Sequence, residues 1–403
     1  MYTQYSKQKT LHVLGPGDRF NYGDLLFPLI IERMLRHKHG VQYLHNYGMV
    51  ASNLSGKGAL PTQSYRQLPA ALPPQGQDWL MVAGGESLGA TRQVLYGFIN
   101  PLYGKLRNFK LFKRLDHRLN LVGRLTGVYN DYPFIPAISP ERVLYNSVGA
   151  SALAKLPPQA LRTLAERLQA SPYVALRCQK SYQVLEPYLD NNLHLVPDCA
   201  MLLNKIYPKF SLSSLCSGQL FNQLPAQYIY VQLSHPKTQG HEAEIASQLT
   251  TLHQKTGLPL VGMPIGTAPG HADHVRLQQM ARRVPGMQYL PVGNIYDIMY
   301  TIAQSQLYVG TSLHGMITAA AYQIPFVSLH PRQTKLVSFQ QTWFTGPASQ
   351  VTPYHKLAEA SLKALSTGPV GVPLDQLEQR VEHSFAAMQQ IINTTAKAKL
   401  VSV

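Results

Sequence analysis

Cysteine is scarce in this sequence. Only Cys178, Cys199 and Cys216 occur in 403 residues, and no two of them have the C-x-x-C spacing of a zinc site or redox pair. An odd count also does not complete a disulfide framework. We therefore expect three ordinary thiols in a reducing compartment, and neither a zinc site nor a disulfide.

Long apolar runs are absent as well. No stretch approaches the eighteen uninterrupted apolar residues that indicate a transmembrane helix. The first ten residues, MYTQYSKQKT, are polar and lack the apolar centre of a secretory signal. These features predict a cytoplasmic protein without membrane spans.

Acidic residues are in short supply. The sequence has 36 Lys plus Arg against 20 Asp plus Glu, and its pI is about 9.6. Such a surplus of positive charge implies an anionic binding partner, which could be nucleic acid, an anionic membrane surface or phosphorylated substrates. Aromatic residues interleave too thinly with the basic ones to indicate nucleic acid, so we expect no nucleic-acid partner.

The positive charge is concentrated in residues 92–124, which contain eight Lys or Arg and one acid, Asp116. Between the charges, leucine and phenylalanine recur at helical spacing. A basic amphipathic helix over 105–124 can lie peripherally on the anionic inner face of a membrane. An equally good interpretation is a solvated helix that covers its own domain.

Several catalytic motifs are missing. We find no GxGxxG, GxxxxGK[ST] or GxSxG pattern, and no paired carboxylates typical of glycoside hydrolysis. Residues 270–274, Gly-His-Ala-Asp-His, look like a metal cluster, but their spacing does not match HExxH. We expect a loop and a helix cap there, and no metal site.

Apolar strands alternate with helices along most of the chain. Examples are the strand-like runs Thr10–Leu14 and Trp79–Ala83 and the helical run Glu242–Thr256. This alternation predicts an α/β protein with two Rossmann-like domains that face each other across a cleft. We divide the chain into an N-terminal domain (1–210), a Ser-rich linker (211–224), a C-terminal domain (225–370) and a last helical segment (371–403) that packs back on both.

The stretch from Gly310 to Leu329 is the clearest candidate site. An apolar strand breaks at Gly310-Thr311-Ser312, and a helix rich in small residues begins near Leu313. Unpaired N–H groups at such a helix start favour an anion. The imidazole of His314 can donate a proton beside them. A purely structural histidine remains the alternative.

Polar residues follow other strands. Arg177 ends an apolar strand, where a buried guanidinium needs an anion; it either pairs with Asp198 or binds a ligand. The loop Asn21-Tyr22-Gly23-Asp24 follows the first strand, and Gly84-Gly85-Glu86 follows the strand Trp79–Ala83. Paired glycines allow a ligand to approach the backbone closely.

These segments together resemble the polysaccharide pyruvyltransferase family. The likeness rests, in order, on NYGD, the glycine run after Val82, LRCQKSYQVLE, PDCAMLL and TSLHGMITAAAYQIPFVSL, followed by Lys335 and Phe339. It implies a two-domain fold of the glycosyltransferase-B type. It also implies transfer of the enolpyruvyl group of phosphoenolpyruvate to a sugar, which forms a pyruvate ketal, with no cofactor.

By this resemblance, Arg177 matches the arginine of a VRD-type motif that helps to bind phosphoenolpyruvate, and His314 matches the histidine of an RLHG-type motif. Two positions depart from the pattern. Ser312 stands where many members have an arginine, and Cys178 stands where an aspartate usually follows. The donor site therefore lacks one expected cation, and our hypothesis is that Lys335 compensates for it.

The roles can be assigned as hypotheses. His314 protonates the methylene carbon or the departing phosphate, and Asp24 or Glu86 accepts the proton of a sugar hydroxyl. The remaining candidates are donor-binding residues Arg177, Gly310, Thr311, Ser312, Leu313 and Lys335, and acceptor-binding residues Asn21, Gly84 and Gly85.

The expected acceptor is a sugar of a surface polysaccharide or of a lipid-linked precursor. Two other functions stay open. The same two-domain cleft serves a glycosyltransferase with a nucleotide-sugar donor. A non-catalytic family member that binds an acidic glycan is favoured by Ser312.

Overall fold

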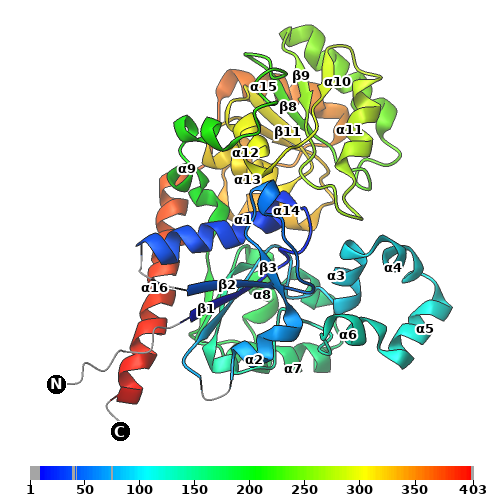
Figure 1. Ribbon diagram of the computed structural model, residues 1–403. Helices are drawn as coiled ribbons and strands as arrows, with labels where there is room; N and C mark the ends of the chain where they lie inside the picture. The colour runs from blue at the N-terminus through cyan, green and yellow to red at the C-terminus, as the bar shows by residue number, and fades with distance from the viewer. Residues whose placement is uncertain (1–9, 39–40, 42, 74–75, 401–403) are drawn as a thin grey trace.

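The computed structural model describes residues 10–38, 41, 43–73 and 76–400. It contains two parallel sheets, one above the other, with helices on their faces (Figure 1). The predicted α/β fold with two Rossmann-like domains is therefore confirmed. Residues 1–9, which make up most of the polar N-terminal stretch discussed above, lie outside the described residues.

The first sheet has seven strands, and each neighbouring pair is parallel. In spatial order they are β3 (Thr62–Ser64), β2 (Tyr43–Gly48), β1 (Thr10–Leu14), β4 (Trp79–Ala83), β5 (Val143–Val148), β6 (Tyr173–Leu176) and β7 (Leu193–Leu195).

The second sheet has five parallel strands. In spatial order they are β10 (Met287–Tyr289), β9 (Leu260–Gly262), β8 (Ile229–Gln232), β11 (Leu307–Gly310) and β12 (Phe326–Ser328).

Most helices follow the strands as crossover connections. Those in the first part of the chain are α1 (Tyr22–Ile31), α2 (Leu68–Ala71), α3 (Arg92–Ile99), α4 (Pro101–Leu106), α5 (Lys110–Leu119), α6 (Leu121–Thr126), α7 (Pro158–Gln169), α8 (Gln179–Leu185) and α9 (Leu203–Ile206). The later ones are α10 (Glu242–Thr256), α11 (Asp273–Ala281), α12 (Ile295–Ala303), α13 (Leu313–Ala321), α14 (Thr334–Trp343), α15 (Leu357–Thr367) and α16 (Leu374–Leu400).

Short irregular turns complete the chain. The π-helical segment η1 (Glu32–Lys38) continues α1. The 3₁₀ turns are η2 (Ser55–Lys57), η3 (Tyr65–Gln67), η4 (Pro140–Arg142), η5 (Ser151–Lys155), η6 (Cys199–Leu202), η7 (Lys209–Leu215), η8 (Gly346–Ser349) and η9 (Tyr354–Lys356).

The central strands could be read from the sequence because they are continuous apolar runs. Every residue of β4 is buried, as expected for a parallel sheet that is covered on both faces. The predicted bounds of β1, β4 and α10 agree with the structure. Strands β2, β3 and β10 are short or polar, and hydrophobic periodicity did not reveal them.

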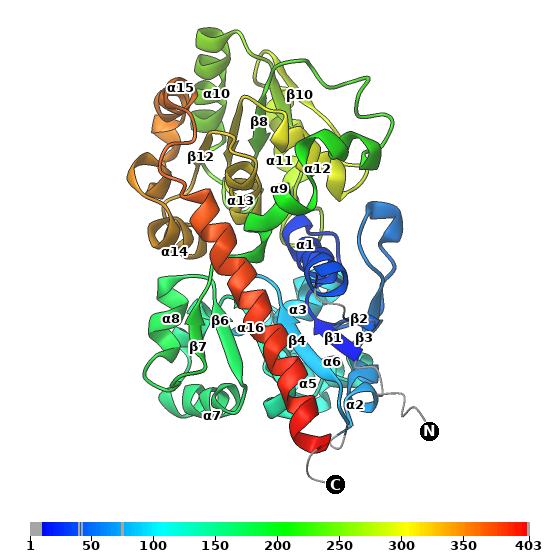
Figure 2. The same ribbon diagram turned by 90° about the vertical axis from the view of Figure 1, so that its left-hand side faces the viewer.

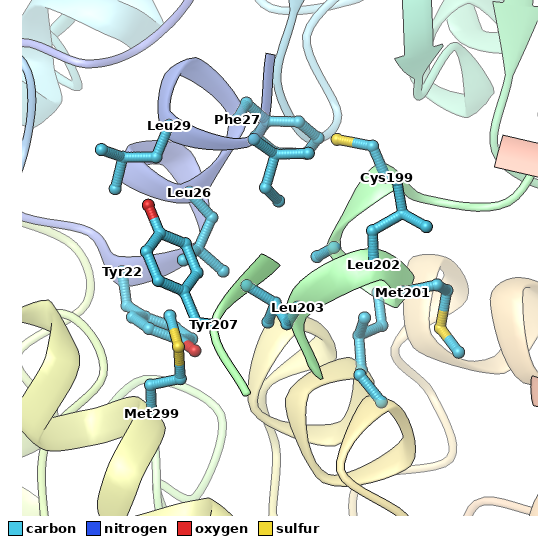
Figure 3. Close-up of a cluster of buried hydrophobic side chains, with 14 of the residues drawn as sticks. Tyr22, Leu26, Phe27, Leu29, Cys199, Met201, Leu202, Leu203, Tyr207 and Met299 are labelled. Atoms are coloured by element: carbon cyan, nitrogen blue, oxygen red, sulfur yellow. The ribbon is translucent and has the colours of Figure 1, made fainter. Parts of the chain in front are cut away.

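One hydrophobic core runs from the first sheet to the second. Figure 3 shows where it crosses: Leu26 and Phe27 of α1 lie near Leu202 and Leu203, with Met299 of α12 close by. The Tyr22 hydroxyl of α1 also lies 2.9 Å from that of Thr318 in α13. The two halves are therefore held in one orientation by apolar packing, which fixes the geometry between their facing loops.

Helix α16 runs back along both domains (Figure 2). The Tyr173 hydroxyl of β6 donates a hydrogen bond to Ser384 at 3.1 Å, and Lys205 lies 3.1 Å from the Glu378 carboxylate. This helix is amphipathic, not uniformly apolar. None of the helices in the described chain is both long enough and apolar enough to cross a membrane.

Candidate functional site

His314 lies in the first turn of α13, directly after β11. Ser312 is the N-cap of this helix, and its hydroxyl accepts a hydrogen bond from the Gly315 N–H at 3.3 Å. The predicted strand, turn, helix and strand are all present. The side chain thus starts at the carboxyl end of a parallel strand, where α/β proteins place their ligands.

The structure joins His314 to Arg177 through a buried carboxylate. His314 Nε2 lies 3.4 Å from Asp198 Oδ2, and Arg177 Nη1 lies 3.2 Å from the same oxygen. Arg177 Nη2 also lies 3.6 Å from Glu86 Oε2. Both Arg177 and Asp198 are almost completely buried. Arg177 therefore has the structural partner Asp198 and, in addition, stands beside the histidine.

Arg177 and His314 stabilise the charged form of Asp198, and Asp198 in turn stabilises that of Arg177. Burial alone would raise the pKa of Asp198, but His314 and Arg177 together hold it below its ordinary value. Burial would lower the pKa of Arg177, and Asp198 and Glu86 raise it instead. Asp198 is thus a fixed anion between two groups that come from different domains.

The imidazole of His314 is held by close packing against α1. A Cβ atom on Gly23 would overlap the His314 ring, whose atoms are its three nearest neighbours. Phe27 contacts the ring edge to face, with the centroids 5.4 Å apart. The sequence around Asn21 gave no sign of this, because the contact joins residues almost 300 positions apart.

The backbone before α13 differs from the expectation. The Thr311 N–H, expected to be unpaired, donates to Gln232 Oε1 at 3.0 Å, and the Thr311 carbonyl accepts from Lys237 Nζ at 2.8 Å. Thr311 and Leu313 are buried. The Thr311 amide is already paired within its domain and is not open to a ligand.

Two lysines supply positive charge near this turn. Burial and, to a smaller extent, the nearby Lys335 lower the pKa of Lys237 to about 7, and Asp273 opposes the shift. Burial also lowers the pKa of Lys335, and Arg177 adds to the effect while Glu86 and Asp24 oppose it. Positive charge at this place is therefore only partly compensated. Lys237 was not recognised from the sequence, where it is one lysine in a polar loop.

Asp24 belongs to a second ion pair at the same place. Its Oδ2 accepts from Asn21 Nδ2 at 2.8 Å and from Arg19 at 3.3 Å. A Cβ atom on Gly85 would lie 3.6 Å from Arg177 Nη1 and 3.8 Å from Asp24 Oδ1. Gly85 therefore lies between the two groups, and its missing side chain leaves space there.

The other two candidates after β4 have structural partners. Gly84 has a φ of 126° and packs against Pro16, so glycine is required there by the backbone. Glu86 Oε1 accepts from the Ser151 hydroxyl at 2.7 Å and from the Ala152 N–H at 3.1 Å. Glu86 thus positions Arg177 and the following loop.

Residues 270–272 lie in a loop, as predicted, but α11 already begins at Asp273 and the expected side-chain cap is absent. The N-cap of α11 is Ala272. His271 from this loop reaches the site: burial lowers its pKa to about 4, Asp24 opposes the shift, and Lys335, Lys237 and Arg19 enhance it. Burial raises the pKa of Asp273 to about 6. Within the described residues, no cluster of His, Cys, Asp and Glu could hold a metal ion.

A groove lies between the two domains, and none of the site residues described so far lines it. It has a volume of about 550 Å³ and lies between α8 of the first domain and α14 of the second. Arg177 precedes α8 by two positions, and Lys335 belongs to α14. Side-chain amides, hydroxyls and two cations line it, chiefly Gln179, Lys180, Gln183, Arg332, Gln341 and Thr342.

The sequence model of the family described as polysaccharide pyruvyl transferase matches residues 21–330, which is well over half of the chain. This chain belongs to that family. It is accordingly a transferase of polysaccharide biosynthesis, and the matched region contains Asp24, Arg177, Asp198 and His314. No curated protein matches the sequence.

Solved structures show the fold of this pyruvyltransferase family member. The Methanocaldococcus jannaschii UDP-GlcNAc 2-epimerase in complex with UDP-GlcNAc and UDP superposes with a TM-score of 0.58 at 13% identity, over 95% of this chain and 99% of that one. The epimerase of Rickettsia bellii gives a TM-score of 0.53 at 10% identity and covers 97% of each chain. At these identities the likeness shows the glycosyltransferase-B-like fold alone.

Proposed function

We propose that this transferase moves the enolpyruvyl group of phosphoenolpyruvate onto a sugar of a surface-polysaccharide or lipid-linked precursor and forms a pyruvate ketal. The observation that supports it most is the cluster of buried, only partly compensated cations around Lys335. Lys237 and Lys335 have lowered pKa values because each is buried near other cations. A ligand with several negative charges would relieve this repulsion.

Phosphoenolpyruvate fits that requirement because it carries a phosphate and a carboxylate close together. In the proposed complex, Arg177 and Lys335 bind the donor from the two domains, and Lys237 adds a third cation near Thr311. A guanidinium and ammonium groups are the side chains best suited to such anions. The two lysines replace the arginine that Ser312 removes from the family pattern.

His314 then acts as the acid. It donates a proton to the methylene carbon of the donor, which becomes a methyl group, and the adjacent carbon gains oxocarbenium character. Asp198 stabilises the imidazolium at 3.4 Å, as a carboxylate does for a catalytic histidine. No cofactor or metal ion is needed for these steps.

Two sugar hydroxyls complete the ketal. The first adds to the positive carbon and gives its proton to Asp24, whose Oδ1 borders the space at Gly85. Phosphate then departs with its electron pair, and the second hydroxyl takes its place and releases its proton to the phosphate. Asp24 then releases its proton to solvent, and His314 takes one up from solvent. The sum is one phosphoenolpyruvate and two hydroxyls converted into one ketal and one inorganic phosphate.

The groove between α8 and α14 is the proposed place for the acceptor. Its side-chain amides and hydroxyls suit sugar hydroxyls. Lys180 and Arg332 suit the diphosphate that links a saccharide to a lipid carrier. Phosphoenolpyruvate is an intracellular metabolite, so the proposed reaction takes place on the inner side of the membrane.

A nucleotide-sugar glycosyltransferase is the second candidate, because the M. jannaschii enzyme with the same fold is a complex with UDP-GlcNAc and UDP. Thermal denaturation with each donor separates the two. A ligand at 100 times its Kd stabilises the folded protein by about 2.7 kcal/mol. We expect phosphoenolpyruvate to raise the melting temperature, and pyruvate, as the control, to leave it nearly unchanged.

Stabilisation by UDP-GlcNAc and not by phosphoenolpyruvate would overturn the proposed donor. The reaction itself is tested with phosphoenolpyruvate and lipid-linked saccharides extracted from the native host. We expect release of phosphate and an added pyruvyl unit in the mass spectrum of the saccharide. Binding of the saccharide without turnover would instead support the non-catalytic function.

A further inference from the structure

Helices α4 to α6 project from the side of the first domain (Figure 1). These helices, the turn between α4 and α5, and the turn after α6 carry most of the large hydrophobic side chains that the described chain exposes: of eleven such residues, seven lie between positions 102 and 129. Leu111 is 79% exposed and Leu102 is 66% exposed. Single exposed leucines are ordinary, but such a concentration marks an interaction surface. The seven residues are Leu102, Phe109, Leu111, Leu115, Leu119, Leu125 and Tyr129.

The packing of helices α4 to α6, which we call the projection, does not depend on these exposed side chains. Its helices are held together from the inside: the Tyr103 hydroxyl donates to Asp116 Oδ2 at 2.8 Å, and Phe112 packs edge to face on Tyr103. Leu111 and Leu115 lie one helical turn apart on α5 and remain exposed. The helix therefore covers its domain with one face only, and a second apolar face has no partner within the described chain.

Positive charge surrounds the exposed leucines. Seven Lys or Arg residues lie between positions 105 and 124, and the single acid of that span, Asp116, is buried against Tyr103. Apolar side chains flanked by cations are typical of helices that lie in the interface of an anionic bilayer. The cations are Lys105, Arg107, Lys110, Lys113, Arg114, Arg118 and Arg124.

We propose that residues 101–126 dock this protein onto an anionic lipid bilayer. The exposed leucines enter the boundary between headgroups and acyl chains, and the lysines and arginines bind lipid phosphates. Docking is a property of this surface and does not depend on the proposed reaction.

The position of this surface links it to the site. Helix α3 leads into α4, and its Phe98 ring lies 5.8 Å from the His271 ring and 5.5 Å from the Arg19 guanidinium carbon. Both contacts belong to the group of residues around Asp24 and Lys335. Docking through α4 to α6 would thus hold the site close to the bilayer, within reach of a lipid-linked acceptor; this consequence alone rests on the proposed function.

The test is flotation of the full-length protein with vesicles, without any substrate. We expect binding to vesicles that contain phosphatidylglycerol, little binding to pure phosphatidylcholine, and release as the salt concentration rises. Each basic residue near an anionic surface contributes enough that Lys110→Gln, Lys113→Gln and Arg114→Gln together should weaken binding on the order of 100-fold.

The matched control replaces three exposed cations of the second domain, Lys255→Gln, Arg282→Gln and Arg283→Gln, and should bind as the parent does. Leu111→Ser with Leu115→Ser should weaken binding at least about 10-fold at fixed charge. Its control is Phe210→Ser, at an exposed residue far from the projection in sequence. Circular dichroism melting of each variant separates lost docking from lost folding.

The charge variants change only exposed side chains, so they decide the question even if the leucine variants unfold. Equal binding by the 110–114 variant and its control would overturn the proposal. Failure of the parent protein to bind the vesicles would also overturn it. So would binding to both nucleic acid and vesicles that the leucine changes leave unaffected, because such binding is general polyanion binding. Failure of pyruvyl transfer with intact vesicle binding would leave docking standing and reject the proposed function alone.

Discussion

Replacing Gly23 by alanine tests the contact that positions His314. Alanine inside a helix normally stabilises it by about 0.5–1 kcal/mol relative to glycine. Here the added methyl would overlap the His314 ring, and overpacking costs about 1–3 kcal/mol. The clash should outweigh the helix gain, so we expect Gly23→Ala to lower the free energy of unfolding by about 1–2 kcal/mol.

Activity should fall much further, because a shift of about 1 Å at a catalytic group can cost on the order of 100-fold in rate. Urea denaturation measures the first effect and phosphate release the second. The control is Gly56→Ala, since a Cβ atom there meets nothing within 4 Å; it should leave both quantities nearly unchanged.

A double-mutant cycle measures whether the effect of Gly23→Ala depends on the His314 ring. In a His314→Ala background the ring is gone, so Gly23→Ala should become neutral or stabilising by about 0.5–1 kcal/mol. The sign of the effect on stability should therefore reverse. If Gly23→Ala destabilises both backgrounds equally, the contact with His314 is not its cause and the positioning argument fails.

Three further predictions follow from the charges of the site. Asp198→Asn leaves buried Arg177 without its closest anion, so the free energy of unfolding should fall by about 3–5 kcal/mol. The control, Asp190→Asn at an exposed position, should lower it by less than about 1 kcal/mol. Equal decreases in the two variants would contradict the prediction. Arg177→Lys should weaken phosphoenolpyruvate binding in calorimetry, because the single ammonium of lysine cannot make the paired hydrogen bonds of a guanidinium. Unchanged affinity would show that Arg177 does not bind the donor. Lys237 has a pKa of about 7 in the free protein, so it must take up a proton to bind an anion at higher pH. Donor affinity should therefore fall as pH rises from 7 to 9, and Lys237→Met should abolish this slope; a parent without the slope would refute the assignment.

The same pKa has a consequence for stability. Lys237 is protonated in the unfolded chain up to its ordinary value near 10.4 but loses its proton near pH 7 when folded. The unfolded state thus binds more protons in this window, and the free energy of unfolding contributed by Lys237 should rise with pH between about 7 and 10. Lys237→Met should flatten that rise in urea denaturation at several pH values.

The site was only partly accessible to sequence reasoning. His314 and Arg177 were found because each follows an apolar strand, and the end of a parallel strand can be located from periodicity. Arg19 and Lys237 were missed, and His271 was assigned to a loop without a role, because no periodic pattern shows which way a loop side chain points. The groove between α8 and α14 was missed because it belongs to two helices of different domains.

By itself, the sequence determined the alternation of strands and helices, the glycosyltransferase-B-like fold and the family, since buried apolar runs and the SLHG segment are local features. Only the tertiary structure decided that Asp198 stands between Arg177 and His314, that Gly23 abuts the imidazole, and that the leucines of α5 face outward. These facts depend on contacts between residues far apart in the chain. Such contacts are set by how whole elements pack, and the order of residues within any one element does not contain them.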